Sequence, residues 1–394
     1  MIGVLRASIG EIEEITLHSS DPDLYKKTPG VKIKPTIYTW AGFQNRNPLV
    51  RMIRLLLLLI AYLTTKTGFP IVISHELMVL IADYKRADLI VFAGGGYLRT
   101  QKGLTQTLNL LMNLSMFQFA KLYGKKTIVA PISIGPFGYT WHERLTARTL
   151  GEFAAVFLRE NHSYTILKKH RVRNILHAND MALLEVHPQK KRNEKDAFVI
   201  GFTIRDWLPG KKQNTLETAY FQALMTFSKK VNAAVQPIVQ VDNNSYGDKD
   251  REIAMNLAHR LTEQGITTLP LKIIKNYPDD TIAYSEIDML LGMRMHSLVF
   301  ATLHNTPFVA VSYEYKTEGL VHSLGLSDLC IPSAKVNEIN LSEMLFKVYK
   351  NRVSLKDSLA KSLQKIRLEE KNRWKNIFSQ WTTLCLILST TSYA

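Results

Sequence analysis

The sequence predicts an α/β protein with two doubly wound lobes and a C-terminal helical segment. Three observations favour this fold class. Short, continuously apolar runs alternate with helical stretches, which is typical of strands buried on both faces of a parallel sheet. A charged stretch interrupts this alternation, which then starts again. The 394 residues also suit two or three domains of about 100–200 residues each.

The first lobe is predicted to cover residues 1–187. Its apolar run 88–93 reads as a buried strand, and three glycines follow it at once. A helix is expected from Leu104 to Tyr123. The later elements repeat the alternation, with strands at 126–130 and 155–158 and a helix at 162–169.

Residues 188–197 are predicted to be a linker, because the stretch opens with Pro188 and is rich in charge. The second lobe is assigned to 198–335. Its expected strands are 198–203, 235–241, 287–291 and 307–312. The expected helices between them are 215–231, 248–264 and 295–304. Residues 336–394 are predicted to be the helical segment, because 340–381 has a helical pattern with exposed bases.

Composition excludes several classes of protein. With 46% hydrophobic and 21% charged residues, the chain is not disordered or low in complexity. Its two cysteines exclude a disulfide scaffold and a cysteine-rich zinc module. The balance of 50 Lys+Arg against 34 Asp+Glu gives a net charge of +16, which favours anionic partners or reflects a general bias towards basic residues.

One apolar stretch, 52–63, is interrupted by Arg54, after which only nine apolar residues run unbroken. A membrane span needs about 20. The stretch therefore reads as a buried or interfacial helix. The N-terminus lacks the apolar core of a signal peptide and carries acids where bases are expected. We expect a cytoplasmic protein, with peripheral docking on the inner face of the cell membrane as an open option.

Candidate binding residues lie where the predicted strands end, because ligands of doubly wound sheets bind beyond those carboxyl ends. Gly94, Gly95 and Gly96 either expose backbone N–H groups to an anion or form a tight strand-to-helix turn. Their spacing does not fit the dinucleotide-binding fingerprint. Ser133 and Gly135 follow the next strand, where we expect them to shape a cleft between the lobes.

The second lobe carries cationic side chains at corresponding positions. Arg205 is either a clamp for carboxylate or phosphate or the partner of Asp206 in a surface ion pair. Arg294 and His296 open a helix directly after a buried strand, where free N–H groups attract anions. His296 is the candidate general acid or base. Lys316 follows the neighbouring strand and either reaches the anion held by Arg294 or is solvated.

Several motifs are absent from the sequence. It has no Walker loop, no H-E-x-x-H, no cysteine ligand pairs and no G-x-S-x-G elbow. Its bases are dispersed, with no recognisable nucleic-acid module. We therefore expect no metal site and no nucleic-acid partner.

Five segments of the sequence resemble the polysaccharide pyruvyl transferase family. The most specific is LLGMRMHSLVFATLHNTPFVAVSYEYKTEGLVHSLGL at 290–326, with its R-x-H-S order and the Pro, Tyr and Lys that follow. The others are ADLIVFAGGGYL (87–98), GKKTIVAPISIGPF (124–137), FLRENHSYTILKKH (157–170) and IGFTIRDW (200–207). The resemblance covers about residues 10 to 330.

This resemblance implies two Rossmann-like lobes of the glycosyltransferase-B type. It implies transfer of pyruvate from phosphoenolpyruvate to a sugar, free or lipid-linked, as a ketal, with no further cofactor. The first lobe would bind the acceptor and the second the donor. By matching positions, Arg205, Arg294 and Lys316 would contact the anion, and His296 would be the catalytic histidine.

The sequence departs from the family pattern in two places. Family members usually begin with a strand and a loop before the helix that reads here as 3–10, so the first strand and loop are expected to be missing. Thr100 stands where many relatives have Asp, which puts that residue's part in holding the acceptor in doubt.

Two other functions remain open. A glycosyltransferase with a nucleotide-sugar donor needs an acid to hold the ribose, for which Glu286 and Glu318 are weak candidates. A non-catalytic relative acting as a scaffold on a membrane face would suit the missing strand and the charge of +16. The intact Arg294 and His296 argue against loss of catalysis.

Overall fold

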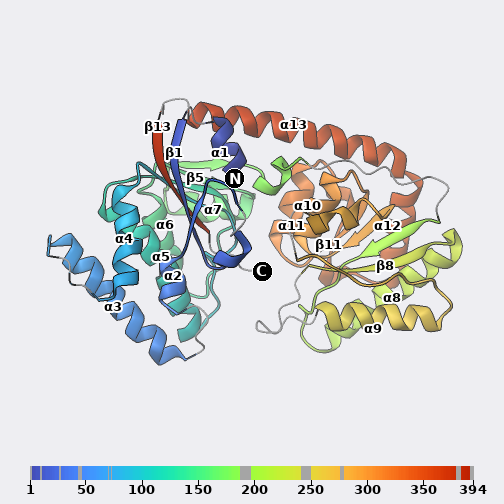
Figure 1. The fold of residues 1–394 in the computed structure, drawn as a ribbon. Coiled ribbons are helices and arrows are strands. Elements are labelled where there is room, and N and C mark those ends of the chain that lie inside the picture. The colour runs from blue at the N-terminus through green and yellow to red at the C-terminus, as the bar shows by residue number, and fades with distance from the viewer. Residues whose placement is uncertain are drawn as a thin grey trace. The chain divides into compact units, whose positions relative to one another are not determined.

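The computed structural model describes ten stretches of the chain: 2–8, 11–25, 28–42, 47–69, 71, 73–186, 197–240, 250–275, 279–378 and 383–390. The chain divides into two compact α/β units (Figure 1). The first contains Met1–Met181 and Glu370–Tyr393, and the second contains Ala182–Glu369. The predicted linker at 188–197 lies almost entirely outside the described residues. The stretch after 335, predicted as a separate segment, is shared between the two units.

The first unit is built on a parallel sheet in the order β2-β1-β13-β3-β4-β5-β6. Its strands are β1 (Glu11–Ser19), β2 (Lys32–Pro35), β3 (Leu89–Phe92), β4 (Lys126–Ile132), β5 (Ala155–Leu158), β6 (Ile175–His177) and β13 (Thr383–Thr390). Its helices are α1 (Ile2–Ser8), α2 (Ile37–Trp40), α3 (Pro48–Lys66), α4 (His75–Arg86), α5 (Leu104–Leu122), α6 (Thr140–Leu150) and α7 (Asn161–Lys169).

The second unit repeats this design with the parallel order β12-β11-β10-β7-β8-β9. Its strands are β7 (Val199–Phe202), β8 (Ala234–Val239), β9 (Lys272–Ile273), β10 (Met289–Gly292), β11 (Phe308–Ser312) and β12 (Cys330–Pro332). Its helices are α8 (Lys211–Val231), α9 (Asp250–Glu263), α10 (Met295–Leu303), α11 (Tyr315–Ser323) and α12 (Glu338–Lys350). The last helix, α13 (Arg352–Phe378), runs from the second unit into the first.

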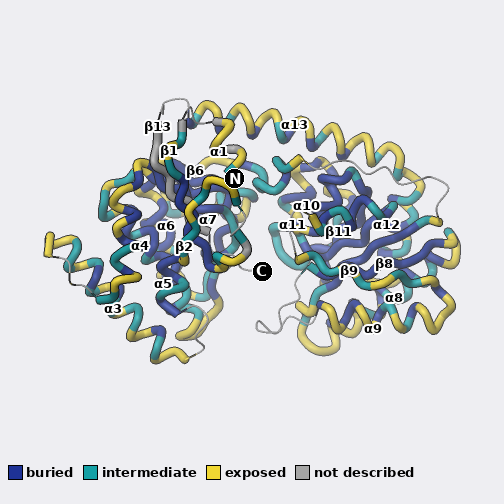
Figure 2. Tube along the Cα trace, in the orientation of Figure 1, coloured by how far each residue is buried: buried dark blue, intermediate teal, exposed yellow. Residues whose placement is uncertain are grey.

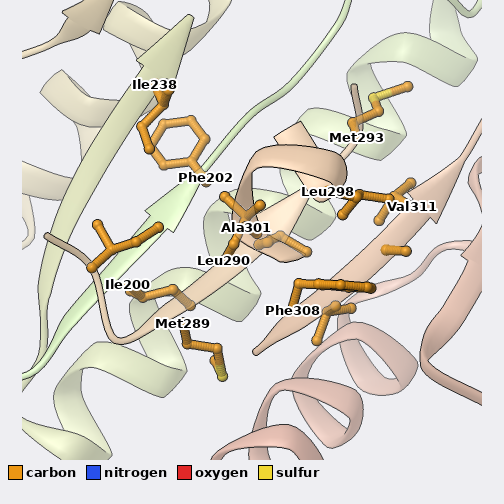
Figure 3. Packing of buried hydrophobic residues seen from close by; sticks show 14 of the residues in the cluster. Ile200, Phe202, Ile238, Met289, Leu290, Met293, Leu298, Ala301, Phe308 and Val311 are labelled. Carbon is orange, nitrogen blue, oxygen red and sulfur yellow. The ribbon is translucent and has the colours of Figure 1, made fainter. Parts of the chain in front are cut away.

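Each unit has its own apolar core, because its central strands carry apolar side chains on both faces. In the first, Phe92 of β3 stacks on Phe117 of α5 with ring centroids 4.0 Å apart. In the second, apolar side chains of β7, β10 and β11 pack with Leu298 and Ala301 of α10 (Figure 3). The central strands of the second unit, β7, β8, β10 and β11, are buried along their whole length and appear dark blue in Figure 2.

The C-terminal strand β13 differs from the sequence prediction, which made 336–394 helical. It lies between β1 and β3, with Ile387 opposite Thr16 on one side and Ile90 on the other. A doubly wound sheet of order 3-2-1-4-5-6 has its first strand at this position. Residues 383–390 therefore occupy the position of the first strand, which the family resemblance led us to expect to be missing. Residues 383–390 pair in parallel with β1 on one side and β3 on the other. This pairing explains why the apolar run forms a strand and not the last part of the predicted helical segment.

Helix α3 also differs from expectation. It has 19 residues and, by length and composition alone, is the one helix of the described residues that is able to cross a membrane. Only 17% of the most apolar 18-residue stretch of this helix is buried inside the protein. The interpretation of 52–63 as a buried helix is therefore wrong, and the interfacial interpretation stays a prediction.

Candidate functional site

The second unit has a topological switch point between β7 and β10. From β7 the chain adds β8 and β9 on one side of the sheet, and then β10, β11 and β12 on the other. Ligands of such sheets bind at this point, beyond the carboxyl ends of the strands. Arg205 follows β7, while Arg294 and His296 follow β10. The structure therefore places these three predicted residues on the two sides of the switch point.

Small side chains hold the two strand ends together. The Thr203 hydroxyl lies 3.0 Å from the Ser297 hydroxyl and accepts the Met293 N–H at 3.0 Å. A Cβ on Gly292 would lie 2.5 Å from Leu298 Cδ2 and 3.0 Å from the Ser297 hydroxyl, so a larger residue here would require these side chains of α10 to move. These buried contacts fix where Arg294 and His296 stand relative to β7.

Arg205 lies against two aromatic rings that also contact each other, with ring centroids 5.0 Å apart. Its guanidinium carbon is 4.6 Å from the centre of the Trp207 ring and 5.0 Å from that of Tyr313, and Nη1 donates to the Tyr313 hydroxyl at 2.9 Å. Tyr313 follows β11, so the loops after β7 and β11 meet here. The buried Gln213 fixes the loop by accepting the N–H groups of Trp207 and Leu208. Contact with two rings and a hydrogen bond to a hydroxyl limit the orientations that this planar cation can take.

Arg294 is the N-cap of α10 and is only 7% exposed. Its Nε donates to Asp250 Oδ2 at 2.6 Å, and Asp250 is also buried. Sequence reasoning missed Asp250, because nothing in the sequence links the first residue of α9 to a residue 44 positions later. The buried ion pair fixes the direction in which the Arg294 guanidinium points, and the Asp250 carboxylate balances its positive charge.

His296 is exposed in the first turn of α10. Its ring stacks on Phe300, one helical turn later, with centroids 6.2 Å apart. Lys316 lies in the first turn of α11, after β11, and its Nζ is 3.3 Å from a carboxylate oxygen of Glu314. Both side chains of this pair are 14% exposed, so the interpretation of Lys316 as a solvated lysine is wrong.

The glycines and the serine predicted in the first unit have packing roles. A Cβ on Gly94 would lie 2.0 Å from the Pro131 carbonyl oxygen, which accounts for that glycine without a ligand. The Gly95 carbonyl accepts the Ser133 N–H at 2.9 Å. Gly135 has φ +79°, a left-handed conformation that favours glycine. Gly96 completes the turn after β3. A part for any of them in substrate binding stays a prediction.

Ser133 belongs to a buried polar cluster that sequence reasoning did not identify. Its hydroxyl donates to Glu160 at 2.9 Å and accepts from Arg159 Nη2 at 2.8 Å. Arg159 also donates to the Gly95 carbonyl at 2.9 Å and forms an ion pair with Asp180. The cluster ties together the ends of β3, β4 and β5 and leaves Ser133 buried at 1% exposure.

The departure at Thr100 has a structural explanation. Its hydroxyl lies 2.8 Å from Nδ1 of the buried His142 and accepts the Gly138 N–H at 3.1 Å. The hydroxyl of Thr107 lies 3.1 Å from the other ring nitrogen. Burial lowers the pKa of His142, so the imidazole is neutral at neutral pH. Thr100 therefore joins the loops after β3 and β4 through a fixed histidine.

Two exposed aromatic side chains stand against His142. The Trp141 ring is 4.1 Å from the imidazole and the Tyr139 ring 5.1 Å, both edge-on. Trp141 is 46% exposed and Tyr139 38%. Both begin α6, beyond the carboxyl end of β4. Sequence reasoning missed this pair because an aromatic residue at a helix start does not reveal whether its ring is buried.

Across the described stretches, no group of three or more His, Cys, Asp or Glu side chains is arranged to hold a metal ion.

Comparison with known proteins identifies similar families and folds. A family model described as polysaccharide pyruvyl transferase matches residues 7–315. The amylovoran biosynthesis protein AmsJ of Erwinia amylovora is 20% identical over 308 residues, which are 72% of this chain and 71% of that protein. The match of the family model includes the switch-point strands, Arg205, Arg294 and His296, and ends one residue before Lys316.

Solved structures share the two-lobed fold. Trehalose-6-phosphate synthase OtsA aligns with a TM-score of 0.57 at 12% identity, over 96% of this chain and 92% of that one. A UDP-forming α,α-trehalose-phosphate synthase from Burkholderia xenovorans, in complex with glucose-6-phosphate, aligns with a TM-score of 0.53 at 10% identity, over 94% and 99%. These likenesses confirm the predicted fold class, two doubly wound lobes of the glycosyltransferase-B type with a C-terminal helical region.

Proposed function

This chain belongs to the polysaccharide pyruvyl transferase family, and from that premise we propose that it transfers pyruvate from phosphoenolpyruvate to a sugar as a ketal. The chain is a transferase of polysaccharide biosynthesis, with a sugar or oligosaccharide as acceptor. The observation that carries the proposal is the switch point of the second unit. It places Arg205, the buried Arg294 and the exposed His296 at adjacent strand ends inside the matched region.

The donor that we propose carries two anionic groups, a carboxylate and a phosphate. Arg205 suits one of them, since its guanidinium is held against the rings of Trp207 and Tyr313. Arg294 and the N–H groups at the start of α10 suit the other. Lys316, after the neighbouring strand β11, adds a third cationic group. These cations stabilise the departing phosphate, and we propose that no resident cofactor is needed.

The reaction that we propose begins when the methylene carbon of phosphoenolpyruvate gains a proton and becomes a methyl group, which leaves the central carbon cation-like. A sugar hydroxyl attacks the central carbon and forms a new C–O bond. His296 supplies the proton to the methylene carbon or relays it there from the attacking hydroxyl. The bond from the central carbon to the phosphate oxygen then breaks. A second hydroxyl of the same sugar closes the ketal, and its proton leaves with the phosphate.

For the acceptor, we propose that the sugar ring lies on the exposed rings of Tyr139 and Trp141. Both are fixed against His142, so a sugar that stacks on them meets a prepared surface. The loop 99–102 lies beside them, because Gly138 approaches the backbone of Gln101 so closely that a Cβ would lie 2.4 Å from it. This loop supplies polar and cationic groups for the sugar hydroxyls.

Replacing Trp141 by alanine tests this assignment. We expect the KM for the acceptor to rise about tenfold, because one stacked ring contributes about 1.5 kcal/mol. The KM for phosphoenolpyruvate should not change. Leu104→Ala is the matched control, since Leu104 is also apolar, 62% exposed and in the same unit. An unchanged acceptor KM in a stable Trp141→Ala variant would reject the aromatic surface while leaving pyruvyl transfer intact.

The location that we propose is the cytoplasm, at the inner face of the cell membrane, where a lipid-linked oligosaccharide acceptor is assembled. The chemistry requires phosphoenolpyruvate, a metabolite of the cytoplasm.

The rival activity is sugar transfer from a nucleotide-sugar donor, which the fold of the trehalose-phosphate synthases favours. Its candidate ribose acids have other contacts. Glu286 lies 3.6 Å from Lys272, and Glu318 accepts from the Ser312 hydroxyl at 2.9 Å. An assay of both donors separates the two activities, because pyruvyl transfer consumes phosphoenolpyruvate whereas sugar transfer releases nucleotide.

A further inference from the structure

Helix α3 presents its apolar residues outward. Six large side chains on it are each about half exposed: Leu49, Met52, Ile53, Leu56, Leu59 and Leu63. Their spacing of three or four residues puts them along one side of the helix. Phe69 and Ile71, just after α3, are 81% and 55% exposed. We call these eight residues the α3 face. Figure 2 shows the helix mostly yellow and teal along its length.

The arginines of α3 point the other way. Arg51 is 6% exposed and donates to the Asn109 side chain of α5 at 2.8 Å. Arg54 donates to the Trp40 carbonyl at 2.6 Å. Tyr62 packs on Phe119 of α5 with ring centroids 5.9 Å apart. The polar contacts of the helix are therefore made with the protein, and its leucines are left to the outside, which reverses the usual arrangement of a surface helix.

The stretch of sequence that contains α3 is strongly basic. Between Asp23 and Glu76 the sequence has no acidic residue and eight bases: Lys26, Lys27, Lys32, Lys34, Arg46, Arg51, Arg54 and Lys66. This segment of 52 residues therefore carries +8, half of the chain's net charge of +16. Lys66, at the end of α3, is exposed, whereas Lys32 and Lys34 form ion pairs with Glu14 and Asp83. The segment therefore favours a partner that accepts apolar side chains and is negatively charged.

We propose that the α3 face docks on the surface of a lipid bilayer rich in anionic headgroups. An apolar helix side within a basic segment matches the two parts of such a surface, its acyl boundary and its negative charge. The helix stays attached to α5 through Arg51 and Tyr62, so it lies in the interface and does not span the bilayer. This inference does not depend on the donor chemistry proposed above, since it rests on α3 alone.

Flotation of the full-length protein with lipid vesicles tests the proposal. We expect binding to vesicles of phosphatidylethanolamine with phosphatidylglycerol, and at least tenfold weaker partitioning to pure phosphatidylcholine. The triple variant Leu56→Gln, Leu59→Gln, Leu63→Gln should reduce partitioning at least tenfold. It should keep the thermal stability of the wild type, because the three side chains are 56%, 51% and 49% exposed.

The matched control is the triple variant Ile339→Gln, Val353→Gln, Leu368→Gln in the second unit. Its side chains are 70%, 69% and 61% exposed, so it removes as many exposed apolar groups at another place. It should bind vesicles like the wild type. Equal binding by both triple variants overturns the assignment to α3, and equal binding to both lipids overturns the anionic surface.

Two other occupants of the α3 face give different results. If a second copy of the chain covers it, the lipid-free protein is dimeric and the α3 variant is monomeric by light scattering. If α3 spans the bilayer, alkaline carbonate does not extract the bound protein. Either result contradicts docking on the bilayer surface. Pyruvyl transfer to a soluble acceptor is expected to be unchanged in the α3 variant, so failure of this inference is distinct from failure of the proposed activity.

Discussion

Replacing His296 by glutamine is expected to reduce turnover at least a hundredfold. Glutamine keeps a polar side chain of similar reach but cannot carry a proton near neutral pH. General acid–base catalysis contributes about 10²–10⁴-fold in rate. Binding of phosphoenolpyruvate should be close to that of the wild type, because the cationic groups of Arg205, Arg294 and Lys316 hold the anion. Turnover and titration calorimetry on one preparation measure both quantities.

The structure makes this experiment sharper than the sequence does. His296 is exposed and its ring contacts Phe300, so the variant should keep the melting temperature of the wild type. His259→Gln is the matched control, since His259 is another exposed histidine on a helix of the same unit. Near-normal turnover in a stable His296→Gln variant would show that His296 does not transfer the proton.

Removing the charge of Arg294 is expected to weaken phosphoenolpyruvate binding at least tenfold. A hydrogen bond to a charged group contributes about 1.5–3 kcal/mol, which corresponds to about 10–150-fold in affinity. The simple variant Arg294→Ala, however, leaves the buried carboxylate of Asp250 without its cation. Breaking a buried ion pair from one side destabilises a protein by about 3–5 kcal/mol. Weaker binding by the Arg294→Ala variant would then have two causes that the measurement does not separate, the missing cation and the loss of folded protein.

A pair of variants separates the two effects. Arg294→Ala combined with Asp250→Ala removes both charges and should fold, yet still bind phosphoenolpyruvate at least tenfold more weakly. Asp250→Asn alone keeps the cation and a hydrogen-bond acceptor, so its folded fraction should bind with a smaller loss. Its melting temperature is measured as well, because it leaves the buried Arg294 without its anion. Unchanged affinity of the folded double variant, measured by calorimetry, would remove Arg294 from the donor site.

The sequence was sufficient for the central strands β3, β4, β5, β7, β8, β10 and β11 and for the residues at their ends, but not for β1, β2, β6, β9, β12 and β13. Continuous apolar runs such as 88–93 and 307–312 have few other structures open to them, and parallel strands bring their carboxyl ends to one edge. Arg205, Arg294 and His296 could therefore be placed together without coordinates. Their roles in catalysis and binding stay predictions.

The partners of these residues could not be predicted. Asp250 and Glu314 are ordinary acids in the sequence, and only the tertiary fold sets Asp250 against Arg294. The same holds for β13, whose apolar run pairs with strands far away in the chain. For α3, the apolar pattern was visible, but which side faces α5 is decided by contacts such as Arg51 with Asn109.

The central claim, pyruvyl transfer from phosphoenolpyruvate, is tested most directly by the products of the purified protein. The protein is incubated with an acceptor oligosaccharide and either phosphoenolpyruvate or a nucleotide sugar, and the acceptor is analysed by mass spectrometry while phosphate and nucleotide release are measured. We predict that phosphoenolpyruvate alone yields a pyruvate ketal on the sugar, with one phosphate released for each ketal formed. Extension of the acceptor by a sugar, with nucleotide released and phosphoenolpyruvate left unconsumed, would contradict the account.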